Sequence, residues 1–276
     1  MAPVFILGCG YTGKRVAARL LDQGIDVAGS ARSVDSLASL VERGLRAVSF
    51  DAEDPTSFEA LSEQLLPGTR LLYSIPTLHG PDGRWEPAAA ILDAIGSQLA
   101  RVVYLSTTGV YGAASHVDDS TDAAPMTNRQ QLRLEAEQAA SSGPWESLVL
   151  RPAAIYGPGR GVQVALPAGK YKLVGDGSNF VSRIHVDDLA AISAAGLLSE
   201  LTGAFPVADD KPCSSREIAE FCADLLEVTL LESVSSADVS ETRRSDRRVD
   251  GRTIRQHLGV KLAYPSYRQG IPASLA

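Results

Sequence analysis

Three glycines near the start of the chain, Gly8, Gly10 and Gly13, form the pattern G-x-G-x-x-G within ILGCGYTGKRVA. At this spacing, glycines allow a tight turn, close approach of the backbone to an anion, and close packing of a helix on a strand. An apolar strand pattern at 3–7 precedes the turn, and a helical pattern at 12–23 follows it. Free N–H groups at the start of that helix would face a pyrophosphate. The residues predict a dinucleotide site, and the alternative is a βα turn without a ligand.

The end of the second expected strand indicates which dinucleotide. An NAD site usually places an Asp or Glu there for the ribose hydroxyls. The segment VAGSARS (27–33) has no acid, whereas Ser30, Arg32 and Ser33 offer donors. A guanidinium can donate two hydrogen bonds to a phosphate, so we favour NADP over NAD. The alternative is that Arg32 is a solvated loop residue. Further cofactor contacts are expected at the turn and at later strand ends: Tyr11, Thr12, Asp51, Ser74 and Pro76.

Short apolar segments alternate with helical patterns through the first half of the chain. Strands are expected at 3–7, 25–30, 46–51, 70–75 and 101–106, and helices at 12–23, 34–43, 55–65 and 84–98. Such alternation indicates a parallel sheet with helices on both faces. Crossovers between parallel strands are nearly always right-handed, so the predicted fold class is α/β, a doubly wound Rossmann sheet.

Beyond Arg151 the alternation loosens, and Gly and Pro become frequent. We therefore expect two units: a dinucleotide-binding domain at 1–156, to which 182–207 returns, and a smaller α/β substrate lobe formed mainly by 157–276. Within that lobe a helix is expected at 214–226. Ser214 or Ser215 can cap it, and Glu217 can complete a capping box with Ser214.

Composition and charge limit the partners. The 276 residues are 45% hydrophobic, enough for a full core, and the net charge of −7 argues against nucleic acid as the main partner. The three cysteines, Cys9, Cys213 and Cys222, show neither metal-ligand spacing nor a disulfide framework, which indicates no metal and a reducing cytoplasm. No apolar stretch approaches the roughly 20 residues that span a membrane. We expect a cytoplasmic protein with a small-molecule substrate and no membrane partner, and a homodimer stays open.

Four later segments occur in a fixed order: LSTTGVYG (105–112), VDDS (117–120), RPAAIYGPG (151–159) and SRIHVDDLAAI (182–192). Together with the glycine-rich turn, they resemble the extended, nucleotide-sugar-epimerase-like branch of the short-chain dehydrogenase/reductase family. The resemblance covers nearly the whole chain. It implies a nicotinamide cofactor and an active site at the carboxyl ends of the strands.

The resemblance also implies a catalytic set, in which the chain departs from the family. A Ser or Thr binds the reacting oxygen, and counting from Tyr111 gives this role to Thr107. A Tyr-x-x-x-Lys pair moves the proton, with the Lys lowering the Tyr pKa from about 10. These positions fall on Arg129 and Arg133. Arginine is not deprotonated in proteins, so Arg129 cannot exchange the proton, whereas Arg133 could hold a ribose hydroxyl or an anion. The alternative is helix ion pairs, such as Arg133 with Glu137.

Other groups that the resemblance brings to the active site are weaker candidates. Tyr111 is the phenol nearest to Thr107 in sequence, and Asp82 falls where relatives carry an active-site Asn. His79 and His185 lie near strand ends, but His185 is more often structural. Asp187 and Asp188 are expected to pin the backbone and cap the following helix. The residues expected to contact the substrate lie on cleft-facing segments: Arg151, Tyr156, Arg160 and Arg183.

The function predicted from the sequence is an NADP-dependent oxidoreductase or an epimerase/dehydratase-like enzyme. Its substrate is expected to be small, with nucleotide-linked and phosphorylated compounds as options, because arginines line the expected cleft. The alternative is a non-catalytic NADP(H)-binding redox sensor or scaffold, which the missing Tyr and Lys favour. DNA binding is a distant third and depends only on the arginines of 243–255.

Overall fold

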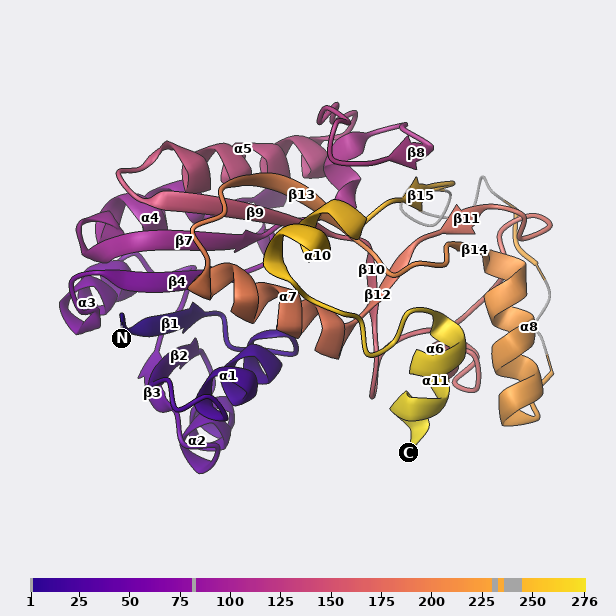
Figure 1. The fold of residues 1–276 in the computed structure, drawn as a ribbon, viewed down its shortest axis with the longest axis horizontal. Coiled ribbons are helices and arrows are strands. Elements are labelled where there is room, and N and C mark those ends of the chain that lie inside the picture. The colour runs from indigo at the N-terminus through magenta and orange to yellow at the C-terminus, as the bar shows by residue number, and fades with distance from the viewer. Residues whose placement is uncertain (1, 81–82, 230–232, 236–244) are drawn as a thin grey trace.

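The computed structural model describes residues 2–80, 83–229, 233–235 and 245–276. Its centre is a seven-stranded sheet in the order β3-β2-β1-β4-β7-β9-β13 (Figure 1). All neighbouring strands in this sheet run parallel. The bounds are β1 Val4–Leu7, β2 Val27–Ala31, β3 Arg46–Ser49, β4 Thr69–Tyr73, β7 Leu99–Leu105, β9 Glu146–Pro152 and β13 Gly203–Val207. The predicted doubly wound α/β fold is confirmed.

Helices cover both faces of the sheet, which explains why its inner strands are apolar along their whole length. Apolar side chains of α1, α2 and α7 pack against one face, and those of α3, α4 and α5 against the other (Figure 1). Every residue of β1 is buried. The bounds are α1 Gly13–Leu21, α2 Val34–Glu42, α3 Thr56–Gln64, α4 Ala88–Ile95, α5 Asn128–Ser142 and α7 Val186–Leu198. Because the strands run parallel, their carboxyl ends form one edge of the sheet, which includes the glycine-rich turn after β1.

The helix expected at 84–98 is wrong at both ends. A hairpin of β5 (Leu78–Gly80) and β6 (Gly83–Trp85) occupies its first residues, and α4 begins only at Ala88. Pro87 explains the late start, because a residue that precedes proline is disfavoured in helical conformation and proline itself suits a helix start. After α4, a 3₁₀ turn at Gly96–Gln98 leads into β7.

The remaining elements lie mainly beside the carboxyl edge of the sheet, where α6, α8 and α11 lie close together as the core of a smaller lobe (Figure 1). One of them, α10 (Arg252–Leu258), instead packs against α7 and β13 of the sheet. The bounds are η2 Thr108–Tyr111, β8 His116–Val117, β10 Ala154–Tyr156, α6 Val162–Ala165, β11 Phe180–Val181, β12 Arg183–His185, β14 Cys213–Ser214, α8 Ser215–Leu226, β15 Arg248–Val249, α10 Arg252–Leu258 and α11 Tyr267–Leu275. Between parts of this lobe the chain returns to the sheet as α7 and β13. The predicted domain boundaries stay a prediction.

The start of α8 follows the predicted cap. The hydroxyl of Ser214 accepts a hydrogen bond from the Glu217 N–H at 3.0 Å. The Glu217 carboxylate accepts hydrogen bonds from Tyr267 at 2.6 Å and Arg268 at 3.1 Å, and so ties α8 to α11. None of the helices that the structure describes is long and apolar enough to span a bilayer.

Candidate cofactor and substrate site

The glycine-rich turn joins β1 to α1 at the carboxyl edge of the sheet. Gly8 has a φ of +81°, which glycine adopts without strain. A Cβ on Gly13 would lie 2.9 Å from the Ile6 side chain, so only glycine lets α1 pack this closely on β1. A Cβ on Gly10 would meet only the Gly8 carbonyl oxygen, at 4.0 Å. The Thr12 side chain does not cap α1. The N–H groups of Lys14 and Arg15 donate to the carbonyls of Gly10 and Thr12, so among the described residues only those of Thr12 and Gly13 are left for an anion at this helix start. Each glycine thus meets the requirement of a pyrophosphate cradle.

The predicted contacts at the end of β2 separate into buried and exposed groups. The Ser30 hydroxyl is buried and accepts a hydrogen bond from the Gly8 N–H at 3.0 Å, so it shapes the turn from within. Arg32 is 70% exposed, and its guanidinium lies 3.6 Å from the carboxylate of Glu53. Ser33 caps α2 through the Ser36 N–H. Asp51, at the end of β3, accepts from the Glu53 N–H and stabilises a turn. Arg32 therefore presents the accessible cation here.

Arg133 takes neither of the arrangements considered from the sequence. Its guanidinium is buried and forms a 3.2 Å ion pair with Glu86, which no sequence signal indicated. It also donates to the carbonyls of Ile75 and Leu105, which follow β4 and end β7, and it lies 4.9 Å from the centre of the Tyr104 ring. The expected pairing of Arg133 with Glu137 is wrong, because Glu137 is bonded elsewhere.

The partners of Glu137 are Ser106 and Arg151. The Ser106 hydroxyl donates to the Glu137 carboxylate, and Arg151 forms a 2.7 Å ion pair with it. The guanidinium of Arg151 lies 4.9 Å from the centre of the Tyr111 ring. All four side chains are buried, and burial raises the pKa of the Tyr111 phenol. Arg151 and Tyr111 therefore face a buried network, and neither side chain is open to a substrate in this conformation.

Thr107 follows β7 by two residues, is half-buried, and caps the 3₁₀ turn η2. Its oxygen accepts from the Gly109 N–H at 3.1 Å, which leaves the hydroxyl hydrogen available to a further acceptor. Buried Arg247 holds the following loop by donating to the carbonyls of Thr108, Gly112 and Ala114. No sequence pattern indicated this role, because Arg247 is one arginine among several at 243–255.

Tyr11 connects the glycine-rich turn to the loop that follows β10. Its hydroxyl donates to the Pro158 carbonyl at 3.1 Å. The guanidinium groups of Arg15 and Arg160 lie 4.3 and 5.5 Å from its ring centre. A Cβ on Gly157 would lie 2.8 Å from the Tyr11 hydroxyl. The expected substrate contact Arg160 is therefore exposed at this junction between the turn and the smaller lobe.

His185 has a structural environment. It is 1% exposed, its Nδ1 accepts from the Asp187 N–H, and burial lowers its pKa. Asp188 accepts from the N–H groups of residues 263 and 264, which confirms that it pins the backbone, while Asp187 forms an ion pair with Arg15. The ring of Tyr156 packs edge-on against His185, and its hydroxyl is buried. Tyr156 thus belongs to the core of the smaller lobe.

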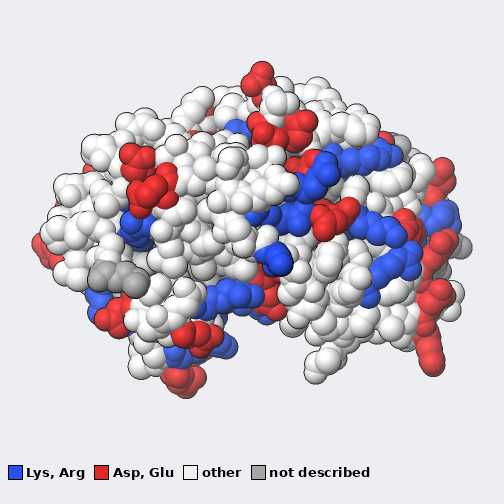
Figure 2. All heavy atoms as spheres, viewed as in Figure 1, with Lys and Arg blue, Asp and Glu red and all other residues white. Residues whose placement is uncertain are grey.

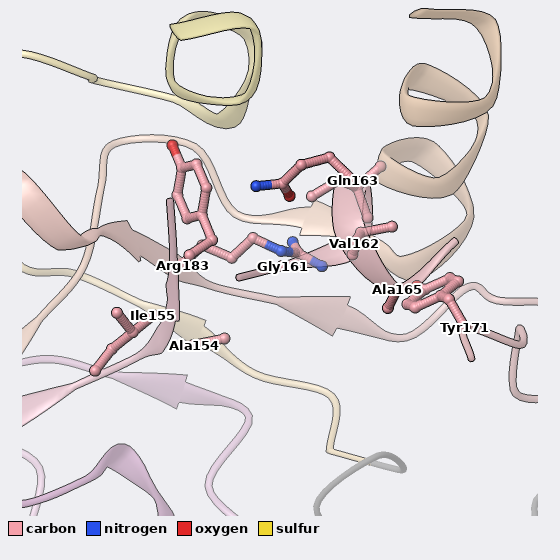
Figure 3. A pocket seen from close by; sticks show the side chains of 10 residues that line it. Ala154, Ile155, Gly161, Val162, Gln163, Ala165, Tyr171 and Arg183 are labelled. Carbon is pink, nitrogen blue, oxygen red and sulfur yellow. The ribbon is translucent and has the colours of Figure 1, made fainter. Parts of the chain in front are cut away.

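Arg183 lines a cavity of about 200 Å³ between β10, β12, α6 and α8. In Figure 3, the Arg183 and Gln163 side chains point into the space bounded by Gly161 and Val162. The Arg183 guanidinium donates to the Val181 carbonyl at 2.8 Å and to the Cys213 sulfur at 3.1 Å. The Gln163 Oε1 atom is buried and has no hydrogen-bond partner within the described chain. The remaining lining is Ala154, Ile155, Tyr156, Ala165, Tyr171 and Ile218.

The other predicted residues are less informative. Asp82 lies outside the described residues. Ser74 and Pro76 follow β4 at the cleft edge, and His79 is exposed on β5. Arg129 is exposed near the start of α5, and burial of part of its side chain lowers its pKa. Their roles stay predictions.

The surface charge of the smaller lobe is mixed. Figure 2 shows basic side chains interspersed with acidic ones over this part of the molecule. Three arginines after residue 247 have carboxylate neighbours: Arg248 with Asp246, Arg252 with Asp250, and Arg255 with Asp210. Arg243 and Arg244, which belong to the same arginine-rich segment, lie outside the described residues. Among the described residues of 243–255, these three arginines are paired with carboxylates, and nucleic-acid binding by the segment stays untested.

Comparison with known proteins places this geometry in a family. A family model described as NAD(P)H-binding matches residues 8–200. The chain is 28% identical over 151 residues to 3-diazoavenalumate denitrifying reductase from a Streptomyces species, and the match spans about half of each protein. A functionally unknown conserved protein from Silicibacter pomeroyi is 30% identical, with a TM-score of 0.81 over 100% of this chain and 98% of that one.

A further solved structure shares the fold at lower identity. The UDP-glucose 4-epimerase of Thermus thermophilus, solved in complex with NAD, has a TM-score of 0.84 at 18% identity, over 99% of this chain and 97% of that one. The resemblance to epimerase-like short-chain dehydrogenases and reductases is thus confirmed for the fold. The chain belongs to the NAD(P)H-binding family, and it has the Rossmann architecture of epimerase-like short-chain dehydrogenases and reductases.

Proposed function

We propose that this protein is an NADP-dependent oxidoreductase that acts on a small substrate between the glycine-rich turn and the smaller lobe. The cradle formed by Gly8, Gly10 and Gly13 carries the proposal. A Cβ would strain or fill the turn at Gly8 and Gly13, whereas the space beside Gly10 is open to a pyrophosphate. Reduction is favoured over epimerisation because the curated relative is a reductase.

Preference for NADP is part of the proposal and rests on Arg32. The side chain is accessible at the end of β2, where a 2′-phosphate lies in NADP-binding Rossmann folds. The bound nicotinamide would supply hydride transfer. Thr107 would donate a hydrogen bond from its hydroxyl to the reacting oxygen, and solvent water would supply the proton, since Arg129 cannot. Tyr11 holds the turn against the loop at Pro158.

A second candidate function is a non-catalytic NADP(H)-binding sensor or scaffold. It is favoured by the arginines at the positions where the family is expected to carry Tyr and Lys, since arginine cannot exchange the proton. The burial of Arg133 against Glu86 also keeps that guanidinium from acting as a mobile cleft cation. Consumption of NADPH with a carbonyl or imine substrate would support the enzyme. Cofactor binding without turnover across such a panel would support the sensor.

Replacement of Gly10 by Val tests the cradle. The new side chain has room in the free protein, so the fold should persist, but it would occupy the place of the pyrophosphate. We expect NADPH affinity, measured by fluorescence titration, to fall at least about tenfold. Ala18→Val, which introduces the same Val side chain on the exposed face of α1, should bind normally. Equal NADPH affinity in the two variants would refute the site.

A further inference from the structure

The cavity beside Arg183 combines one buried cation with an apolar wall. Arg183 is 6% exposed, and no carboxylate of the described chain lies within 4.0 Å of its guanidinium. Its hydrogen bonds within the described chain use the Nη1 nitrogen alone. The Nε and Nη2 nitrogens have no acceptor among the described residues and are not sealed from solvent. A buried cation with spare donors is costly unless an anion or water completes its shell. The cavity can therefore accommodate a hydrogen-bond acceptor of a ligand beside Arg183.

The charge that this cavity can compensate is close to a single negative unit. Arg183 is the only Lys or Arg among the residues that line it. Two arginines on segments next to lining residues have other partners: the guanidinium of Arg216 lies 3.5 Å from Glu220, and that of Arg160 lies 5.5 Å from the centre of the Tyr11 ring. Burial raises the pKa of Asp209 to about 7, so near neutral pH this carboxyl is only partly ionised. It therefore balances only part of the positive charge of Arg183. A pyrophosphate would bring more charge than these groups balance.

The size and lining of the cavity favour a compact, largely apolar ligand. Its volume is about 200 Å³. An apolar cavity of about 150 Å³ holds benzene, and pockets for larger ligands usually exceed about 300 Å³. A single ring with a short acidic substituent fits, whereas a nucleotide sugar does not. Ile155, Val162 and Ile218 supply aliphatic contacts, and Tyr171 supplies an aromatic one.

The cavity is also positioned for the proposed reaction. Its wall includes β10 and the loop after it, and this loop contacts the glycine-rich turn through Tyr11 and Pro158. Ala154 and Ile155, at its mouth, are more exposed than Arg183.

We propose that this cavity binds a small apolar monocarboxylic acid, with the carboxylate on Arg183 and the ring or chain against the aliphatic wall. The inference rests on the proposed oxidoreductase function, for which such acids would be the substrate class. It departs from the nucleotide-linked substrates that the sequence left as an option.

Calorimetric titration of the whole chain without cofactor tests the charge requirement. The probes are cinnamate, its uncharged counterpart cinnamamide, and UDP. We expect cinnamate to bind at least about tenfold more tightly than cinnamamide, since a charged hydrogen bond contributes about 1.5–3 kcal/mol. UDP should bind more weakly than cinnamate. No measurable cinnamate binding, equal binding of cinnamate and cinnamamide, or tighter binding of UDP would overturn the proposal.

Two variants test the location. Arg183→Met should lower cinnamate affinity about ten- to a hundredfold and leave cinnamamide unchanged. Ala165→Leu fills the cavity from α6 and should abolish binding while the protein stays folded. Val164→Leu, which introduces the same Leu side chain on the exposed side of the same helix, is the control and should bind like the wild type. If Ala165→Leu and Val164→Leu bind cinnamate equally, the cavity is not the site, even where Arg183→Met fails to fold.

A separate NADPH titration distinguishes this proposal from the proposed function. Normal NADPH binding without carboxylate binding would overturn the substrate class alone. Carboxylate binding without NADPH binding would overturn the oxidoreductase and leave the cavity assignment supported, because the cavity exists in the protein without cofactor.

Discussion

Asp209 should make the stability of this protein fall as the pH rises. The residue follows β13 and is 2% exposed. Its Oδ1 atom accepts from the Lys211 N–H at 3.1 Å, while Oδ2 is buried without a hydrogen-bond partner among the described residues. Burial raises its pKa from 3.8 to about 7. The folded protein therefore holds this proton more tightly than the unfolded chain does.

The sign and size of the effect follow from these values. The stabilisation by the protonated form is fully present below the unfolded pKa, near 4, and is lost as the pH rises through about 7. At about 1.36 kcal/mol per pKa unit, the whole loss is on the order of 4 kcal/mol. Roughly 2–3 kcal/mol of it falls between about pH 5 and 8. Asp209→Asn mimics the protonated carboxyl at every pH and should remove this dependence.

Urea unfolding from acidic to mildly alkaline pH measures the difference. The free energy of unfolding of the wild type should fall more steeply with pH than that of Asp209→Asn, by about 2–3 kcal/mol in total. Asp224→Asn, on the exposed face of α8, controls for the loss of one carboxylate. Parallel pH profiles for the wild type and Asp209→Asn would refute the reasoning.

Two further predictions concern the cofactor edge. Arg32→Ala should weaken NADP binding by about 1.5–3 kcal/mol and leave NAD binding nearly unchanged, and equal affinities of the wild type for both cofactors would contradict the NADP assignment. Arg133→Met leaves the Glu86 carboxylate buried and unpaired, so urea unfolding should show a loss of about 3–5 kcal/mol, which Glu86→Leu in the same chain should largely restore. If Arg133→Met alone is as stable as the wild type, the Arg133–Glu86 ion pair does not stabilise the ends of β4 and β7.

Local sequence was sufficient where the physical requirement is itself local. The glycine spacing at Gly8–Gly13 follows from the backbone of one turn, and the strands of the sheet follow from runs of residues buried on both faces. The Ser214 cap needed only the N–H group three residues away. These features were enough to predict the fold class, which is confirmed, and the glycine-rich turn proposed as the dinucleotide site, without knowledge of any distant contact.

Tertiary structure decided which partners the charged side chains take. On a helix surface Arg133 and Glu137 would meet at four residues, but each is buried against a different neighbour: Arg133 against Glu86, and Glu137 against Arg151. A buried charge must find a partner wherever the packed elements bring one, at any separation in sequence. The same holds for Arg183, whose segment the sequence placed near the substrate. Only the packing of β12 against α6 and α8 enclosed it in a small apolar cavity.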